Sequence, residues 1–144
     1  MNMRLVITGA ITALALGAAW EGAEAGSAMQ KALDNGATRL TADQIAEQFV
    51  GRTGIWISAS GDKKIAIYYG RDNDLHAQKV GGGWSATGYY GIADTNNICI
   101  SWAGKDKGRL RCFDVLIVKG VVTKYKADGA LNGSYEKFAA GKTF

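Results

Sequence analysis

From residue 51 onward, short turn-forming segments interrupt the sequence at a spacing of about 8–12 residues, which is typical of all-β domains. They are rich in Gly, Asp, Asn and Ser, the residue types that form tight turns. The runs between them, such as Ile65–Tyr69 and Val121–Tyr125, are rich in β-branched and aromatic residues. The turn segments are 60–63, 71–74, 81–83, 94–97, 104–107, 119–120 and 128–129. The sequence therefore predicts a mainly β fold, an antiparallel meander of about eight short strands that forms a small barrel or a sandwich.

The composition agrees with a single globular domain. The 144 residues include 20 Gly and no Pro, so a collagen-like chain and a Pro-rich linker are excluded. Hydrophobic residues make up 47% of the chain and aromatic residues 10%, which is enough to bury a core. The formal net charge of +4 comes from scattered residues. It serves solubility or favours anionic partners, but it lacks the clustered basic stripe of a nucleic-acid-binding protein.

Residues 1–25 match a secretory signal peptide. Arg4 precedes an uncharged run from Leu5 to Trp20, and Ala23-Glu24-Ala25 offers small residues at the positions that a signal peptidase reads. The uncharged run is shorter than the roughly 20 apolar residues of a transmembrane helix. The predicted strands are also shorter than the about 9–11 residues of a membrane-spanning strand. We therefore expect a periplasmic or secreted protein with no transmembrane segment after cleavage.

One short helix is expected before the strands, at about 42–50. Thr41 and Gln44 are spaced as a capping box, and Gly51 ends the periodic segment. Ile45 and Phe49 share one face, and because so short a helix is not stable alone, they should pack on the sheet. Residues 26–40 show no periodicity and are predicted to be a flexible lead or a frayed helix. Residues 41–144 would then form one β-rich domain.

The two cysteines are predicted to form a disulfide. Cys99 and Cys112 lie in β-prone runs on either side of the polar turn at 104–107. A hairpin with that turn places the two cysteines opposite each other, and places Trp102 opposite Arg109, where a cation–π contact is expected. In an oxidising compartment such a pair is oxidised. Their spacing does not match the Cys-x-x-Cys of redox enzymes, so the predicted role is structural.

Several stretches follow one family pattern. They are the helix-then-glycine opening at 41–51, Tyr-Tyr-Gly at 68–70, Ile-Cys-Ile-Ser-Trp at 98–102 and Arg-Cys-Phe at 111–113. Over about residues 40–144 this arrangement resembles domain of unknown function nine-nine-five, a family of small exported bacterial proteins. The family has no assigned activity. The resemblance therefore implies an exported compartment and this fold type, and it carries over no functional residues.

The sequence holds no clear catalytic motif. His76 is the only histidine, and no nucleophile elbow accompanies it. Asp72-Asn73-Asp74 begins like a calcium loop but lacks the later Gly and Glu, so it is interpreted as a turn. Gly81-Gly82-Gly83 is not followed by the Lys of a phosphate-binding loop. We predict no metal and no cofactor, and the alternative is a hydrolytic enzyme with a dispersed site around His76 and Asp72 or Asp74.

Aromatic residues on neighbouring predicted strands give the more informative pattern. In each Tyr-Tyr pair one side chain must point outward, because neighbours in a strand face opposite sides. Beside basic residues, outward aromatics would form a surface suited to sugars, peptides or an acidic protein. The candidate surface comprises Trp56, Tyr68, Tyr69, Trp84, Tyr89, Tyr90, Lys63, Lys64 and Arg71.

These observations favour an exported, non-enzymatic binding protein of the bacterial cell envelope. Its partner would be a protein, a glycan or a small ligand. As an inhibitor of a lysozyme or protease, it would insert the turn at 104–108 into an active site. As a calycin-like barrel, it would hold a small apolar ligand in its interior.

Overall fold

A computed structural model of the chain describes residues 26–144, so the predicted signal peptide lies outside the described residues. The helices are α1 (Ala28–Asp34) and α2 (Ala42–Phe49), with a 3-10 turn at Asp106–Gly108. The strands are β1 (Thr38–Arg39), β2 (Arg52–Ser58), β3 (Lys64–Tyr69), β4 (Asp74–Lys79), β5 (Ser85–Ala93), β6 (Asn97–Trp102), β7 (Arg111–Val118), β8 (Val121–Tyr125) and β9 (Leu131–Ala140).

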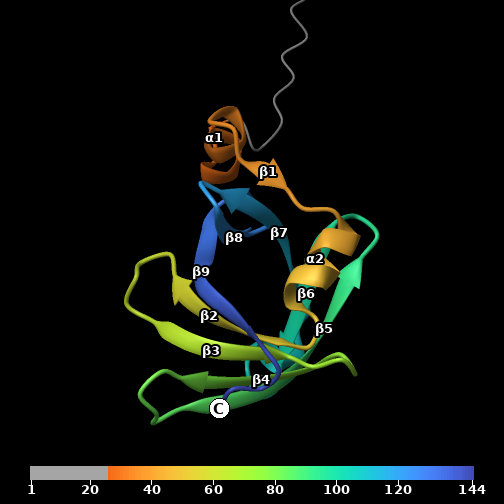
Figure 1. The fold of residues 1–144 in the computed structure, drawn as a ribbon, viewed down its shortest axis with the longest axis vertical. Helices are drawn as coiled ribbons and strands as arrows, with labels where there is room; N and C mark the ends of the chain where they lie inside the picture. Colours follow the sequence, from red (N-terminus) through yellow and green to blue (C-terminus); the bar gives the residue numbers. More distant parts are fainter. Residues whose placement is uncertain (1–25) are drawn as a thin grey trace, which may run out of the picture.

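The strands form a closed antiparallel barrel (Figure 1). Strands β2 to β9 each pair with the next one along the chain, and β2 also pairs with β9, which closes the barrel. The predicted β-rich meander is confirmed, and of its two forms the structure is the barrel. Each predicted turn falls at a junction between two strands. The additional strand β1 pairs with β7, where Thr38 lies opposite Ile117.

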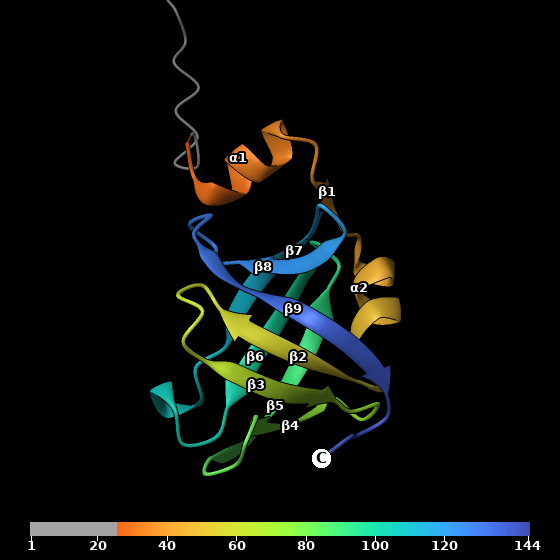
Figure 2. The same cartoon turned by 60° about the vertical axis from the view of Figure 1, so that its left-hand side comes forward.

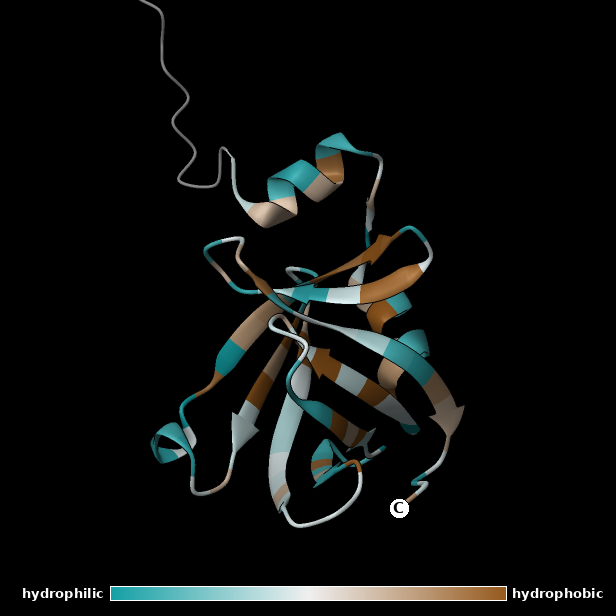
Figure 3. Cartoon of the chain, turned by 90° about the vertical axis from the view of Figure 1, so that its left-hand side faces the viewer, coloured by the Kyte–Doolittle hydropathy of each residue, from teal (hydrophilic) through white to brown (hydrophobic). Residues whose placement is uncertain are grey.

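Side chains alternate between the interior and the exterior of the barrel along each strand. Tyr69 and Tyr90 point inward and are 0% and 5% exposed, whereas Tyr89 points outward and is 70% exposed. The predicted division of each Tyr pair between two faces is therefore confirmed. Figure 3 shows the same alternation as changes between hydrophilic and hydrophobic colours along the strands.

Helix α2 closes one end of the barrel. Its capping box is present: the Thr41 hydroxyl accepts from the Gln44 backbone N–H, and the Gln44 side chain accepts from the Thr41 backbone N–H at 2.9 Å. Ile45 and Phe49 are completely buried in the barrel core. In Figure 2, α2 lies at one end of the barrel, and the β2–β3 and β6–β7 loops lie at the opposite end.

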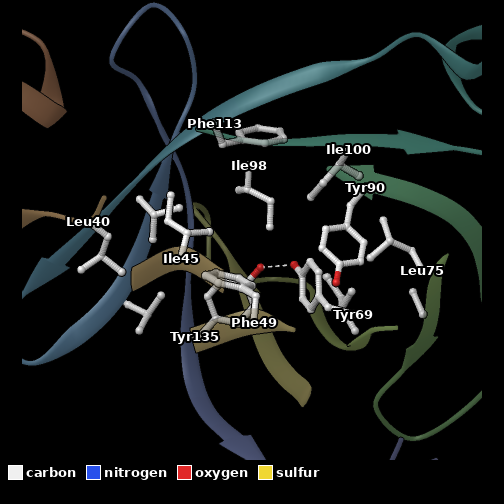
Figure 4. Close-up of a cluster of buried hydrophobic side chains, with 14 residues drawn as sticks. Leu40, Ile45, Phe49, Tyr69, Leu75, Tyr90, Ile98, Ile100, Phe113 and Tyr135 are labelled. Carbon is white, nitrogen blue, oxygen red and sulfur yellow. Dashed lines mark hydrogen bonds between the residues drawn. The ribbon is translucent and has the colours of Figure 1, made fainter. Parts of the chain in front are cut away.

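Aromatic rings fill the core beneath α2 (Figure 4). The Phe49 ring packs edge-on against Tyr69, Tyr135 and Phe138, with ring centroids 4.9, 5.3 and 5.2 Å away. The Tyr69 and Tyr135 hydroxyls hydrogen-bond to each other, and the Tyr90 hydroxyl donates to the Gly70 carbonyl at 2.7 Å. These polar groups are therefore paired inside an apolar core, as buried groups must be.

Residues 26–40, expected to be a flexible lead or a frayed helix, contain a short helix that packs on the barrel. They hold α1 and β1, and Met29 of α1 is buried against Leu116 and Tyr125 on the outside of the barrel. Figure 3 shows α1 lying over the hydrophobic β7–β8 hairpin. The seven residues of α1 are too few to show a helical period in the sequence. It is the contact with the barrel that holds this segment in place.

The β6–β7 loop is longer than predicted. Cys99 pairs with Cys112 as expected and forms the disulfide, but the ladder ends at Ile100 and Arg111. Residues 103–110 leave the sheet because Asp106 and Lys107 adopt left-handed conformations, with φ of 52° and 56°. Trp102 therefore does not pair with Arg109. Among residues 26–144 no cation–π contact joins these two, and Trp102 lines the barrel interior instead.

Removing the disulfide should destabilise the protein without changing its fold. Cys99 and Cys112 are separated by 13 residues, and a closed loop of this length contributes about 3 kcal/mol in the chain-entropy model. We expect the double variant Cys99→Ser/Cys112→Ser to lose this amount in urea unfolding. The reduced protein should show the same loss, and unchanged stability on reduction would contradict the prediction.

Candidate functional site: the barrel cavity

A cavity of about 830 Å³ opens at the end of the barrel opposite α2. It exists because β4 and β5 place small side chains, Ala77 and Ala86, on the interior face. Its floor is formed by residues such as Ile67, Ile100 and Phe113, and below them the interior is filled by the aromatic core. Cavities of a few hundred Å³ and above are the usual size of small-molecule sites.

Aromatic side chains form much of the cavity wall. Trp56 comes from β2, Trp102 from the end of β6 and Phe113 from β7, and all three line the cavity. Trp84 lies in the β4–β5 loop at the mouth and is 47% exposed. Four aromatic rings from four parts of the chain thus surround one space, which suits a ligand with an apolar body.

A buried lysine lies among these rings. Lys124 on β8 is 3% exposed, and its side chain lines the cavity. Its Nζ lies 4.8 Å from the centroid of the Phe113 ring, 5.5 Å from that of Tyr135 and 5.8 Å from that of Trp56. Burial lowers the pKa of the Lys124 amine from 10.5 to about 7. Contacts with the ring faces offset only part of the cost of removing the Lys124 ammonium from water.

Within residues 26–144, Lys124 has no acidic partner. In the part of the chain that the structure describes, no ion pair and no side-chain hydrogen bond involves its amine. Two carboxylates line the same cavity, but Asp106 pairs with Arg111, and Asp62 accepts hydrogen bonds from Ser58 and Ser60. A buried amine without a counter-charge is uncommon, because its desolvation opposes folding.

Two polar atoms of residues that line the cavity also lack partners within residues 26–144. Trp56 Nε1 and Asn132 Oδ1 are buried without exposed surface and make no hydrogen bond there. The Trp56 indole lies against the backbone of Gly133, since a Cβ built on Gly133 would meet Nε1 at 2.4 Å. Gly133 is itself the partner of Lys124 across β8 and β9. The indole N–H is therefore held in the same part of the barrel as Lys124.

The mouth of the cavity is basic. Five cationic residues line the cavity in addition to the buried lysine, against the carboxylates Asp62 and Asp106, and two of the five are ion-paired, Lys64 with Glu136 and Arg111 with Asp106. These five are Lys63, Lys64, Lys79, Lys105 and Arg111. Such a rim attracts anions and speeds their approach.

The structure divides the candidate surface predicted from the sequence. Trp56, Trp84, Lys63 and Lys64 come together at the cavity. Tyr69 and Tyr90 are core residues, and Tyr68 and Tyr89 point outward from β3 and β5. Arg71 lies at the other end of the barrel, beside Gly51 and α2. The cavity therefore collects four of the nine residues, and the other five do not form one surface with them.

Sequence reasoning missed Lys124, Trp102, Phe113 and Asn132 as cavity residues. The sequence predicts a contact of Trp102 with Arg109, whereas in the structure Trp102 shares the inward face of β6 with the core residues Ile98 and Ile100. For Lys124 the only signal is its parity with Val122, a buried interior residue of β8. A lysine in an exposed position would give the same local sequence.

His76 lies on the outside of the barrel. Its Nε2 is 2.9 Å from Asp74 Oδ2 on the same strand, and its ring is near Tyr68. Within residues 26–144, no side chain besides Asp74 hydrogen-bonds to His76, so no nucleophile is placed for it to activate. Asp72, the other predicted partner, is exposed in the β3–β4 turn.

Over residues 26–144 no cluster of three metal-ligating side chains occurs, and no helix there has the length and apolar character needed to cross a membrane. Searches of protein-family models, curated proteins and solved structures found no match to this chain. The resemblance to domain of unknown function nine-nine-five stays a prediction.

Proposed function

We propose that this chain is an exported, non-enzymatic binding protein of the cell envelope that holds a small ligand with an apolar body inside its barrel. The observation that carries the proposal is the aromatic-walled cavity, open at one end and closed by α2 and the core at the other. Its volume of about 830 Å³ lies within the range of small-molecule sites. A periplasmic or secreted location is supported by the signal-peptide pattern of the sequence and by the disulfide.

The unpartnered groups in the cavity support binding over a purely structural role. Trp56 Nε1, Asn132 Oδ1 and the Lys124 amine all lower stability where they lie. An apolar residue of similar volume in place of Lys124 would stabilise the barrel more, so this amine at the cavity wall is best explained by contact with a bound molecule. The outward tyrosines, in contrast, lie on strands on either side of β4 and enclose no comparable space.

Blocking the cavity should abolish binding. We expect the protein to bind the neutral apolar dye N-phenyl-1-naphthylamine saturably, with energy transfer from the cavity tryptophans. Ala86→Phe places a ring in the cavity and should weaken binding at least about tenfold, a change of about 1.4 kcal/mol. The matched control Ala139→Phe, at an exposed site on β9, should bind like the unchanged protein. Absence of saturable binding, or equal binding by both variants, would refute the proposal.

A further inference from the structure

The amine of Lys124 is a buried cationic group in the cavity wall, and a purely apolar ligand would make no polar contact with it. The amine lies beside the cavity floor, because its Nζ is 4.8 Å from the ring centroid of the floor residue Phe113 and 5.5 Å from that of the core residue Tyr135. Of the titratable groups on the neighbouring strands, Tyr135 of β9 lies beside the amine, and Arg111 of β7 lies at the cavity mouth. Arg111 is paired with Asp106, and the Tyr135 hydroxyl is bonded to Tyr69. Neither supplies a negative charge.

We propose that the cavity takes a ligand with an apolar body and one acid group, and that the acid group pairs with Nζ of Lys124. This inference rests on the proposed function and adds the chemical class of the ligand. An anion beside the amine would provide the counter-charge that the protein lacks. The apolar body would extend from there along Trp56 and Trp102 toward the mouth.

The chemistry of the amine favours an acid over other polar head groups. An ammonium is a donor without acceptor capacity, so it pairs with an oxygen of the ligand. The Trp56 indole N–H has no accessible surface and packs against Gly133, so Lys124 is the donor that a ligand in the cavity would reach. A hydroxyl-bearing ligand could accept as well, but only an anion also neutralises the ammonium. Hydrogen bonds between charged partners are the stronger ones.

The basic rim would help such a ligand to enter. Lys63, Lys79 and Lys105 line the mouth, so an anionic molecule approaches along a favourable potential. These exposed charges are screened by salt and should affect the rate of binding more than its equilibrium. Lys124, which is buried, should decide the affinity.

The test compares decanoic acid with decan-1-ol, which share an apolar chain and differ in the head group. Each is titrated at pH 7 against protein loaded with N-phenyl-1-naphthylamine. We expect the acid to bind at least about tenfold more tightly than the alcohol. In Lys124→Met this ratio should fall to about one, while the alcohol binds at least as well as before. The matched control Lys126→Met, at an exposed position outside the cavity, should keep the ratio.

A second measurement does not depend on a variant. The NMR signal of the Lys124 side chain, titrated with pH, should show that decanoic acid raises the pKa of the amine and that decan-1-ol does not. Equal affinity for acid and alcohol, together with saturable dye binding, would overturn the acid-group assignment and leave the proposed function standing. An acid preference that survives in Lys124→Met would also overturn it. Failure of the dye, the acid and the alcohol to bind would refute both proposals.

Discussion

Replacing Lys124 with methionine is expected to raise the free energy of unfolding at pH 6 by about 2 to 4 kcal/mol. Burial lowers the pKa of the Lys124 amine to about 7, so at pH 6 the native state carries a buried and unpaired positive charge. In the unfolded state the same charge is in water. Methionine has a similar shape and no charge, so the substitution removes the desolvation cost and keeps the packing.

The stability advantage of Lys124→Met over the unchanged protein should shrink as the pH rises from 7 to 10.5. In this range the unfolded state holds a proton on Lys124 that the native state has released. The free energy of unfolding of the unchanged protein therefore rises by up to about 1.4 kcal/mol per pH unit. Above pH 10 the buried tyrosines should lower the free energy of unfolding as the pH rises. Burial raises the pKa of Tyr90 to about 12 and also raises the pKa values of Tyr69 and Tyr135, so the unfolded state loses protons first. Stability should therefore peak near pH 10.

Urea unfolding at pH 6, 8 and 10, followed by tryptophan fluorescence, measures this dependence. The control Lys126→Met removes an exposed lysine just after β8 and should change stability little at any pH. The free energy of unfolding of Lys124→Met is compared with that of the unchanged protein at each pH. If this difference were the same at all three pH values, the prediction that Lys124 is a buried amine without a counter-charge would be wrong. A variant that is more stable but binds acid more weakly would show that stability is lowered here in favour of binding.

The fold was largely predictable because its signals are local. Each turn contains residues that accept left-handed conformations, as at Asn73 and Gly129, with φ of 66° and 81°. The α2 boundaries follow from the Thr41–Gln44 capping box, which involves only residues three apart. The disulfide register follows from the position of one turn. Closure of the barrel, in contrast, depends on pairing between β2 and β9, about eighty residues apart, and no local pattern encodes it.

The site was less predictable because it depends on which face of each strand points inward. In Val121–Tyr125 the residues Val122, Thr123, Lys124 and Tyr125 are all buried, some by the core and some by α1. A strand covered on both faces shows no alternation, so the sequence does not reveal where its lysine points. Among residues 26–144, Lys124 is the one cationic side chain in the buried core.

Phe49→Ala is expected to lower the free energy of unfolding by about 3–5 kcal/mol. The side chain is 0% exposed and packs edge-on against three aromatic rings of β3 and β9. Removing it leaves a cavity among large, rigid rings, which collapse poorly to fill it. Helix α2 has eight residues and is held to the barrel by Phe49 and Ile45, so the substitution also weakens the closure of that end.

The control for this prediction is Glu47→Ala, at an exposed position of the same helix, which should change stability by no more than about 0.5 kcal/mol. Urea unfolding at pH 8 measures both variants. Because Phe49 packs with Tyr69 and Tyr135 in the layer below the cavity floor, its loss should also loosen the wall behind Lys124. Dye binding by Phe49→Ala should therefore weaken as well. A loss in stability of less than about 1 kcal/mol would mean that α2 is not the element that closes the barrel.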